Sequence, residues 1–485
     1  MQRKFLTNLG FLLLLNLLIK PFWIFGIDRT VQNVVGAQDF GFYFVVFNFS
    51  FLFNILLDFG ITNFNNKNIA QNSQLLNKHF SGILIIKFLL AIVYFVLTFS
   101  VGLLWGFRGN ELWMLALLAL NQFFISLILY LRSNISALLL FKTDSLLSVL
   151  DRMLMIAICS VLLWGNITEQ QFRIEWFVYT QTFSYIITAF IAFIIVVKKA
   201  SFRKLKWNSA FFMMILKQSL PFALLFLLMT FYNRFDTVMI KRMLSGNEGN
   251  IQAGIYAHAY RLLDASNNIA YLFSVLLLPL FARLIKKGPG LENLVRLSFS
   301  ILFVGSVILA TGSVFYRVEL MDLMYENYVQ ESASVFAVLM GCFVAISTTY
   351  VFGTLLTANG SLKMLNFAAA LGMLLNIVMN LILIPAYGAL GSAWASLVTQ
   401  FSMAVVQVIL AQIIFRFRIN PRYLASLFVF IIMVILFNLI SISLNLFWIK
   451  SFLLMVAISV LTAMGLKLLD IGNFIKIVGG SKTPV

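Results

Sequence analysis

Five cationic side chains occur inside long apolar stretches of the sequence, where charged residues are rare: Lys20, Lys87, Arg152, Arg234 and Arg261. A charged side chain at the centre of a membrane-spanning helix costs about 2.5–3.5 kcal/mol on insertion scales. Such side chains therefore usually face a protein interior or a water-filled cavity. A cationic interior predicts a ligand that is an anion.

The first candidate for binding this anion is Lys20, which precedes Pro21 in the first apolar stretch. Proline frees a backbone carbonyl and can kink a helix. A lysine at this depth does not easily reach either membrane surface, so we predict that Lys20 faces a cavity. The alternatives are that its ammonium extends to the outer headgroups or that it forms a buried structural pair.

The second half of the chain supplies two further candidates, Arg234 and Arg261. Asp236 lies two residues after Arg234, on the opposite side of a helix, so the two charges do not simply neutralise each other. Asp264 lies three residues after Arg261, on the same face, which favours an ion pair. The sequence leaves open whether Arg261 is used by that pair or by a ligand.

Other charged residues in apolar stretches are predicted to have a structural or coupling role. Asp58 could be a counter-charge or a coupling carboxylate, like Asp236 and Asp264, and the alternative for it is solvation at a helix end. For Lys87 and Arg152, pairing between helices is favoured over ligand binding. The two cysteines, Cys159 and Cys342, lie in apolar runs without a CxxC partner, so neither a metal site nor a cofactor is expected.

The composition identifies the kind of protein that positions these residues. Of the 485 residues 61% are hydrophobic and only 11% are charged, and the mean hydropathy is +0.97. Soluble domains carry about 25% charged residues, so this is an all-α polytopic membrane protein. The net charge of +18 does not indicate nucleic-acid binding, because the basic residues lie in short loops between apolar runs.

A membrane-spanning helix needs about 20 predominantly apolar residues. The sequence predicts fourteen such segments, at 6–26, 42–62, 81–105, 112–131, 145–164, 175–197, 211–233, 254–281, 297–316, 333–356, 364–385, 389–413, 423–444 and 448–467.

The basic residues test this count and set the orientation. With the N-terminus in the cytoplasm, 23 of the 35 Lys and Arg residues fall in inner segments and 7 in outer segments. Cytoplasmic loops are enriched in Lys and Arg. One missed helix would exchange inner and outer segments in the rest of the chain and remove this charge difference. Both termini are therefore predicted to be cytoplasmic.

Two halves of the chain resemble each other. Phe40-Gly41-Phe42-Tyr43 follows the first segment, and Ala253-Gly254-Ile255-Tyr256 follows the seventh. Six segments per half give parallel repeats, and ligand sites in such folds lie between the halves. The predicted domains are a six-helix lobe at 1–197, a basic cytoplasmic linker at 198–210, a second six-helix lobe at 211–413, and two more helices with a cytoplasmic tail at 414–485.

Three stretches resemble a known family. They are Val35-Gly36-Ala37-Gln38-Asp39-Phe40-Gly41-Phe42-Tyr43 with Leu57-Asp58-Phe59-Gly60; Arg234-Phe235-Asp236-Thr237-Val238-Met239-Ile240 with Ala253-Gly254-Ile255-Tyr256-Ala257 and Arg261; and Asn376 to Asn380 with Leu383-Ile384-Pro385-Ala386-Tyr387-Gly388 and Gly391-Ser392-Ala393-Trp394-Ala395. With the segment count, the chain is similar to the Wzx-type flippases of lipid-linked oligosaccharides, in the multidrug/oligosaccharidyl-lipid/polysaccharide exporter superfamily.

That resemblance implies a function in the bacterial inner membrane. The implied cargo is a polyprenyl-diphosphate-linked glycan, such as an O-antigen precursor of lipopolysaccharide, moved from the cytoplasmic to the periplasmic leaflet by alternating access. Lys20, Arg234 and Arg261 are then candidates for binding the diphosphate. Membrane lipids and polysaccharide polymerase machinery are the implied partners. The last two helices are expected to form a groove for the lipid tail, or alternatively to brace the second lobe or form a dimer contact.

Two other functions remain open from the sequence. An ion-coupled multidrug exporter of the same superfamily would favour carboxylates in the cavity, and the cations outnumber the acids only slightly. A membrane glycosyltransferase or polymerase is less favoured, because the outer loops are short and contain no histidine. No G-x-x-x-x-G-K-[ST] loop is present, which disfavours an ATP-driven pump, and no enzyme activity is expected.

Overall fold

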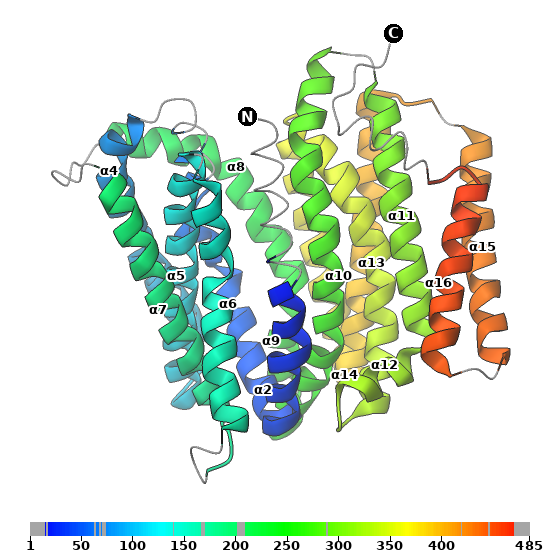
Figure 1. Cartoon of the computed structure of the whole chain (residues 1–485), viewed down its shortest axis with the longest axis horizontal. Coiled ribbons are helices and arrows are strands. Elements are labelled where there is room, and N and C mark those ends of the chain that lie inside the picture. Colours follow the sequence, from blue (N-terminus) through cyan, green and yellow to red (C-terminus); the bar gives the residue numbers. More distant parts are fainter. Residues whose placement is uncertain are drawn as a thin grey trace. The chain divides into compact units, whose positions relative to one another are not determined.

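The computed structural model of the chain is all-helical in the part that it describes (Figure 1). That part comprises residues 15, 18–62, 65–66, 69, 74–138, 140–165, 170–200, 209–287, 290–418, 420–444 and 447–469. The start of the first predicted segment, most of the basic linker and the C-terminal tail lie outside the described residues.

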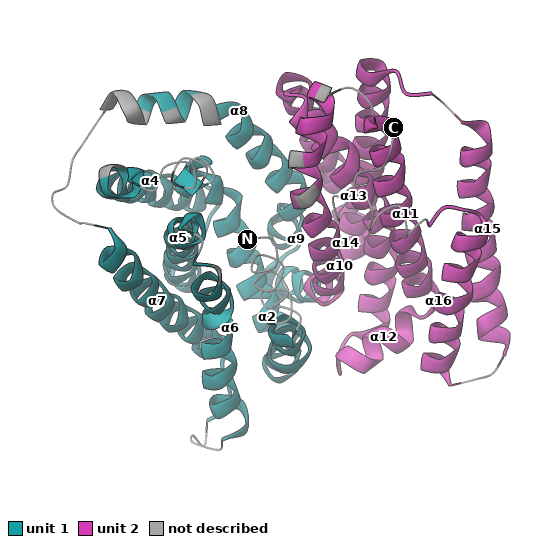
Figure 2. Ribbon diagram, turned by 45° about the horizontal axis from the view of Figure 1, so that its top comes forward, with its two compact units in different colours: residues 1–254 teal, residues 255–485 magenta. Residues whose placement is uncertain are grey.

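The chain forms two compact units, Met1–Gly254 and Ile255–Val485, and the division falls inside a long helix (Figure 2). The first unit contains η1 (Phe22–Asp28, a π-helix), α2 (Arg29–Leu52), η2 (Asn54–Leu57, a 3₁₀-helix), α4 (Leu75–Leu104), α5 (Asn110–Ala137), α6 (Phe141–Trp164), α7 (Ile174–Lys199), α8 (Ser209–Arg234), α9 (Asp236–Met243) and the start of α10 (Gly246–Lys287).

The second unit contains the remainder of α10 and the helices that follow it. These are α11 (Leu291–Phe315), α12 (Arg317–Met324), α13 (Val329–Ala358), α14 (Leu362–Phe415), α15 (Pro421–Ser443) and α16 (Trp448–Gly465). Between the predicted segments 297–316 and 333–356 the structure adds the short helix α12, which buries Met321 and Met324.

Eleven of the described helices are long and apolar enough to cross a membrane, or twelve if the bent pair α8–α9 counts as one span. Two of these contain a glycine at which the backbone leaves the helical conformation, Gly36 (φ 79°, ψ 168°) and Gly388 (φ 54°, ψ −131°). Both glycines fall between segments that were predicted separately. The polytopic all-α class is confirmed, and the exact count of fourteen stays a prediction.

Helices are the secondary structure expected for apolar segments that cross a membrane. In hydrocarbon each unsatisfied backbone polar group costs several kcal/mol, and a helix satisfies these groups within itself. The predicted segment 42–62 ends early, because α2 stops at Leu52 and the backbone beyond it tightens into η2. Side chains of neighbouring helices take over the hydrogen bonding there, as described below.

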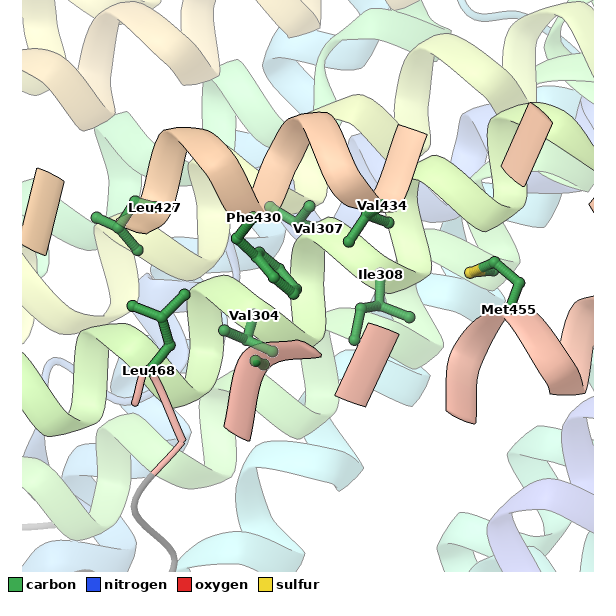
Figure 3. Packing of buried hydrophobic residues seen from close by; sticks show 9 residues of the cluster. Val304, Val307, Ile308, Leu427, Phe430, Val434, Met455 and Leu468 are labelled. Carbon is green, nitrogen blue, oxygen red and sulfur yellow. The ribbon is translucent and has the colours of Figure 1, made fainter. Parts of the chain in front are cut away.

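The last two helices pack on α11 through a closed hydrophobic cluster (Figure 3). Val304, Val307 and Ile308 of α11 meet Leu427, Phe430 and Val434 of α15, with Met455 of α16 alongside. This packing braces the second unit. The tail-binding groove that the resemblance implied for these helices stays a prediction, as does the division at 198–210.

Candidate functional site

The site in the first unit begins where the chain folds back on itself. η1 leads into α2, and at Gly36 the positive φ turns the chain so that Trp23 and Tyr43 both contact the ring of Phe177. A glycine suits this position because a side chain is strained at such a φ. Asp28 lies at the end of η1 and is only 2% exposed. π-helical turns are frequent at functional sites.

Arg152 of α6 reaches this fold. Its guanidinium carbon lies 5.1 Å from the centre of the Trp23 ring, and its Nε lies 3.7 Å from the Asp151 carboxylate. The guanidinium also donates a hydrogen bond to the Tyr185 phenol of α7 and interacts electrostatically with Asp28 and Tyr43. These contacts fix the plane and direction of the guanidinium.

Lys20 joins the same group of charges. It is exposed, and it interacts electrostatically with Arg152 and with Asp151. Lys20 lies three residues before Trp23, the ring on which the Arg152 guanidinium packs. We call Lys20, Asp28, Tyr43, Asp151, Arg152 and Tyr185 the Arg152 cluster.

Two amides hold the buried side of the Arg152 cluster. Gln32 Nε2 donates to Asp28 Oδ2 at 2.8 Å, and Gln181 Nε2 donates to the Tyr43 phenol oxygen at 3.1 Å. Trp23 stacks on Phe177 with ring centroids 5.8 Å apart. The cluster thus has an aromatic and hydrogen-bonded base in α2 and α7.

The chemistry of the Arg152 cluster follows from its two cations and two carboxylates. A guanidinium offers five N–H donors in a planar fork that matches phosphate, and an ammonium adds a flexible point charge. An anion can therefore be held between a fixed donor and a mobile one. The carboxylates keep the site near neutrality without an anion and offer a place for a cation or a proton.

Lys87 has a different role from the other cations, because its ammonium is only 2% exposed and fully used. It pairs with Asp58, donates to the Leu57 carbonyl at 3.0 Å and donates to Ser126 Oγ at 2.9 Å. An ammonium has three donors, so none remains for a ligand. Asp58, predicted as a counter-charge or coupling carboxylate, is the partner of Lys87 and also accepts from Thr62.

Arg234 and Asp236 flank a bend of 47° between α8 and α9. The guanidinium of Arg234 lies 5.4 Å from the Phe51 ring of α2, whereas Asp236 is buried at the start of α9. A carboxylate there is stabilised by the helix dipole. Next to it, Asn48 Nδ2 donates to Thr237 Oγ1 at 3.0 Å.

Arg261 and Asp264 lie in the second unit and are half-buried on α10. Nearby, His258 Nδ1 lies 3.1 Å from Ser332 Oγ, and the His258 ring stacks on Tyr325 with centroids 4.0 Å apart. The roles assigned to Arg234, Arg261, Asp236 and Asp264 stay predictions.

The two similar motifs, one around Gly41 and one around Gly254, approach each other within the first unit. A Cβ at Gly41 would lie 1.9 Å from the Asn250 carbonyl oxygen, and one at Gly254 would lie 2.0 Å from the Ala37 carbonyl oxygen. Only glycine permits this approach of α2 to the start of α10. The Lys241–Glu111 ion pair links α9 and α5 in the same unit.

Sequence reasoning identified Lys20 but assigned Arg152 to structural pairing, and it did not select Trp23 or Tyr185. The available signal was the closeness of Trp23 to Lys20 in the sequence. Tyr185 gave no signal, because one tyrosine in an apolar helix is ordinary. In the part of the chain that the structure describes, no group of His, Cys, Asp and Glu converges to hold a metal ion.

Solved structures share this fold. Lipid II flippase MurJ in an inward closed conformation matches with a TM-score of 0.71 and 13% identity, covering 96% of this chain and 99% of that one. An inward-facing multidrug resistance MATE family transporter of the MOP superfamily matches with 0.61 and 13%, covering 82% and 93%. A MOP superfamily transporter from Pyrococcus furiosus Vc1 (DSM3638) matches with 0.53 and 15%, covering 84% and 92%.

At these identities the structural matches show the fold alone. No curated protein matches the sequence significantly. A family model described as polysaccharide biosynthesis protein matches residues 5–285, which is more than half of the chain and includes the whole Arg152 cluster. The chain therefore belongs to the polysaccharide biosynthesis protein family.

Proposed function

We propose that the protein flips polyprenyl-diphosphate-linked oligosaccharides from the cytoplasmic to the periplasmic leaflet of the bacterial inner membrane. It does so by alternating access, with both termini in the cytoplasm and without enzymatic chemistry. The glycan serves cell-surface polysaccharide synthesis, such as that of O-antigen and lipopolysaccharide. The protein then acts upstream of polysaccharide polymerase machinery.

The observation that carries this proposal is that Lys20 and Arg152, in apolar segments of a polysaccharide biosynthesis protein, lie near enough for their positive charges to repel each other when no anion is bound. Two neighbouring cations in a low-dielectric site favour an anion with two charged groups, because each cation can bind one group and also attracts the other. A diphosphate has that chemistry. The fold shared with the lipid II flippase adds support, because that protein's stated cargo is a lipid.

The other predicted residues fit around this centre. Arg234 and Arg261 are proposed as further contacts of the diphosphate during the cycle. Asp236 and Asp264 are proposed as their counter-charges. Asp58 acts through Lys87, so its contribution is to hold the end of η2 against α4 and α5.

A second candidate function is ion-coupled export of cationic drugs. The observation in its favour is that Asp28 and Asp151 balance the two cations of the Arg152 cluster. The fold is shared with MATE transporters as well. In that case Asp28 would bind the coupling ion or the drug, and Arg152 would only stabilise the negative charge of the two carboxylates.

Transport by the purified full-length chain separates these functions. In proteoliposomes we expect translocation of a polyprenyl-diphosphate-linked glycan, followed by its accessibility to an impermeant glycan-cleaving enzyme. We expect no uptake of an organic cation driven by a proton or sodium gradient. Gradient-driven cation uptake without movement of the lipid-linked glycan would overturn the proposal in favour of drug export.

Charge removal tests the assigned residues. Lys20→Ala and Arg234→Ala should each reduce glycan translocation while leaving protein yield in the membrane near normal. Arg234→Lys should restore part of the activity, because a point charge binds phosphate without the guanidinium fork. Full activity in the double alanine variant would show that these two cations do not bind the cargo.

A further inference from the structure

A groove in the second unit lies away from the residues discussed so far, along α14. This helix consists of two parts joined at Gly388, where the backbone is not helical. The parts run antiparallel: Ser392 Oγ donates to Asn380 Oδ1 at 2.7 Å, and a Cβ at Gly372 would lie 2.6 Å from Met403 Sδ. Asn380 therefore lies beside Ser392 near Gly388, and Gly372 lies beside Met403 farther from it.

Between the two parts lies a cavity of about 510 Å³ with an almost wholly apolar lining. Phe367 and Leu371 form one wall and Leu410 lies on the other, while Gly372 and Met403 meet at its base. The absence of a side chain at Gly372 leaves room between the parts. The volume falls within the range of ligand sites, about 300–1,000 Å³.

The length of the groove matches one leaflet of a membrane. Its lining runs along the first part of α14 from Lys363 to Leu375, which is about 18 Å at 1.5 Å per residue. Half of a hydrocarbon core of about 30 Å is about 15 Å. A single acyl chain entering from the Lys363 end would therefore reach the bilayer midplane within the groove.

The mouth of the groove is basic. Lys363 lines it and is exposed, and Arg416 and Arg418 follow directly on the end of the opposite part of α14. The first backbone N–H groups of α14, which begins at Leu362, point to the same end and favour an anion. Basic pockets between transmembrane helices are suited to anionic headgroups.

We infer that this groove binds an anionic phospholipid of the surrounding membrane, with one acyl chain along Phe367, Leu371 and Leu410 and the phosphate at Lys363. The complementarity of charge at the mouth and of length along the lining selects this occupant. The lipid is a resident partner of the second unit, and its binding does not depend on the proposed transport function.

Native mass spectrometry of the full-length protein tests this inference, with phosphatidylglycerol and phosphatidylcholine of equal chain length as probes. We expect tighter binding of phosphatidylglycerol. Lys363→Gln should weaken phosphatidylglycerol binding about fivefold, since one basic residue near a membrane surface has an effect of that size. It should weaken phosphatidylcholine binding less, because the choline cation offsets the attraction of that lipid's phosphate to Lys363. Lys450→Gln, which removes an exposed lysine elsewhere in this unit, should leave the preference intact.

The apolar wall is tested separately. Leu371→Asn should weaken both phospholipids, because it makes the groove polar, whereas Leu381→Asn should weaken neither. The two leucines are matched, at 52% and 53% exposed on the same part of α14. Equal binding of the two phospholipids to the unaltered protein, or an unchanged preference in Lys363→Gln, would overturn the inference. Displacement of phosphatidylglycerol by polyprenyl-diphosphate-linked glycan would also overturn it, by assigning the groove to the cargo.

Discussion

At the scale of single residues, the intramembrane cations differ in what surrounds them. The ammonium of Lys87 contacts Asp58, Ser126 and the Leu57 carbonyl, so its three N–H donors are all used within the protein. Arg152 is oriented by Trp23 and Tyr185, and Lys20 beside it is exposed. The difference shows that the ammonium of Lys87 is used within the protein, and the ligand-binding roles of Lys20 and Arg152 stay proposals.

The Lys87–Asp58 pair gives a prediction about stability. Asp58→Asn leaves the buried ammonium of Lys87 without its counter-charge and should destabilise the protein by about 3–5 kcal/mol. Lys87→Met should cost less, because the Asp58 side chain is 25% exposed and still accepts from Thr62. The double variant should recover much of this loss, because no unpaired charge remains. Thermal unfolding of the detergent-purified variants measures the effect. Unfolding temperatures that simply add, with no recovery in the double variant, would mean that the two side chains are not coupled.

The sequence predicted these residues unequally, for physical reasons. Lys20 was selected because an ammonium beside a proline in an apolar helix cannot easily reach either membrane surface, and its role in binding the ligand stays a prediction. The difference between Lys87 and Arg152 could not be predicted, because both are single cations in apolar helices. What separates them is the partners that tertiary packing brings from other helices, and nothing in the local spacing encodes those partners.

At the scale of helices, Gly41 and Gly254, from the two similar motifs, permit a close approach of two backbones. Gly41 and Gly254 let α2 and the start of α10 approach until backbone meets backbone. Comparison of the two halves of the sequence placed these glycines at matching positions of two similar motifs. It could not predict that the copies face each other, because an internal repeat specifies similarity and not contact.

This contact predicts a strong effect of the smallest substitution. A Cβ at Gly254 would lie 2.0 Å from the Ala37 carbonyl oxygen, which is backbone and has no rotamer to change, so Gly254→Ala should destabilise the protein and lower its yield. Gly305→Ala in α11 is the matched control, because its Cβ would meet no atom within 4 Å and alanine favours helix. Equal thermal stability of the two variants in detergent would contradict the close packing described here.

The helix boundaries show where sequence patterns succeed. Long apolar runs predict α6, α7, α13, α15 and α16 to within about four residues of their limits, whereas α5 ends later and α11 begins earlier than predicted. The predicted helix at 42–62 ended at Leu52 instead. There the Leu57 carbonyl is taken by Lys87 and Ser126, a contact across roughly 30 and 69 positions of sequence that local apolarity does not reveal.

At the scale of the whole molecule, the basic residues predict an orientation in the membrane. Single cysteines at Ser361 and Asn327, in a background without Cys159 and Cys342, lie beyond opposite ends of α13. In intact cells an impermeant thiol reagent should label the cysteine at 327 and should reach the one at 361 only after permeabilisation. The reverse pattern would invert the orientation and, with it, the assignment of both termini to the cytoplasm.

The central claim is that Lys20 and Arg152 hold the anionic headgroup that the protein moves. The most direct measurement is the translocation rate of a polyprenyl-diphosphate-linked glycan in proteoliposomes containing Arg152→Ala, Arg152→Lys or Arg173→Ala. Losing a charge-assisted hydrogen bond costs about 1.5–3 kcal/mol, so we expect Arg152→Ala to be slower by about 10- to 100-fold. We expect Arg152→Lys to be intermediate, and Arg173→Ala, which removes an exposed arginine of the same unit, to match the unaltered protein. Equal rates for Arg152→Ala and Arg173→Ala, at equal protein incorporation, would contradict the claim.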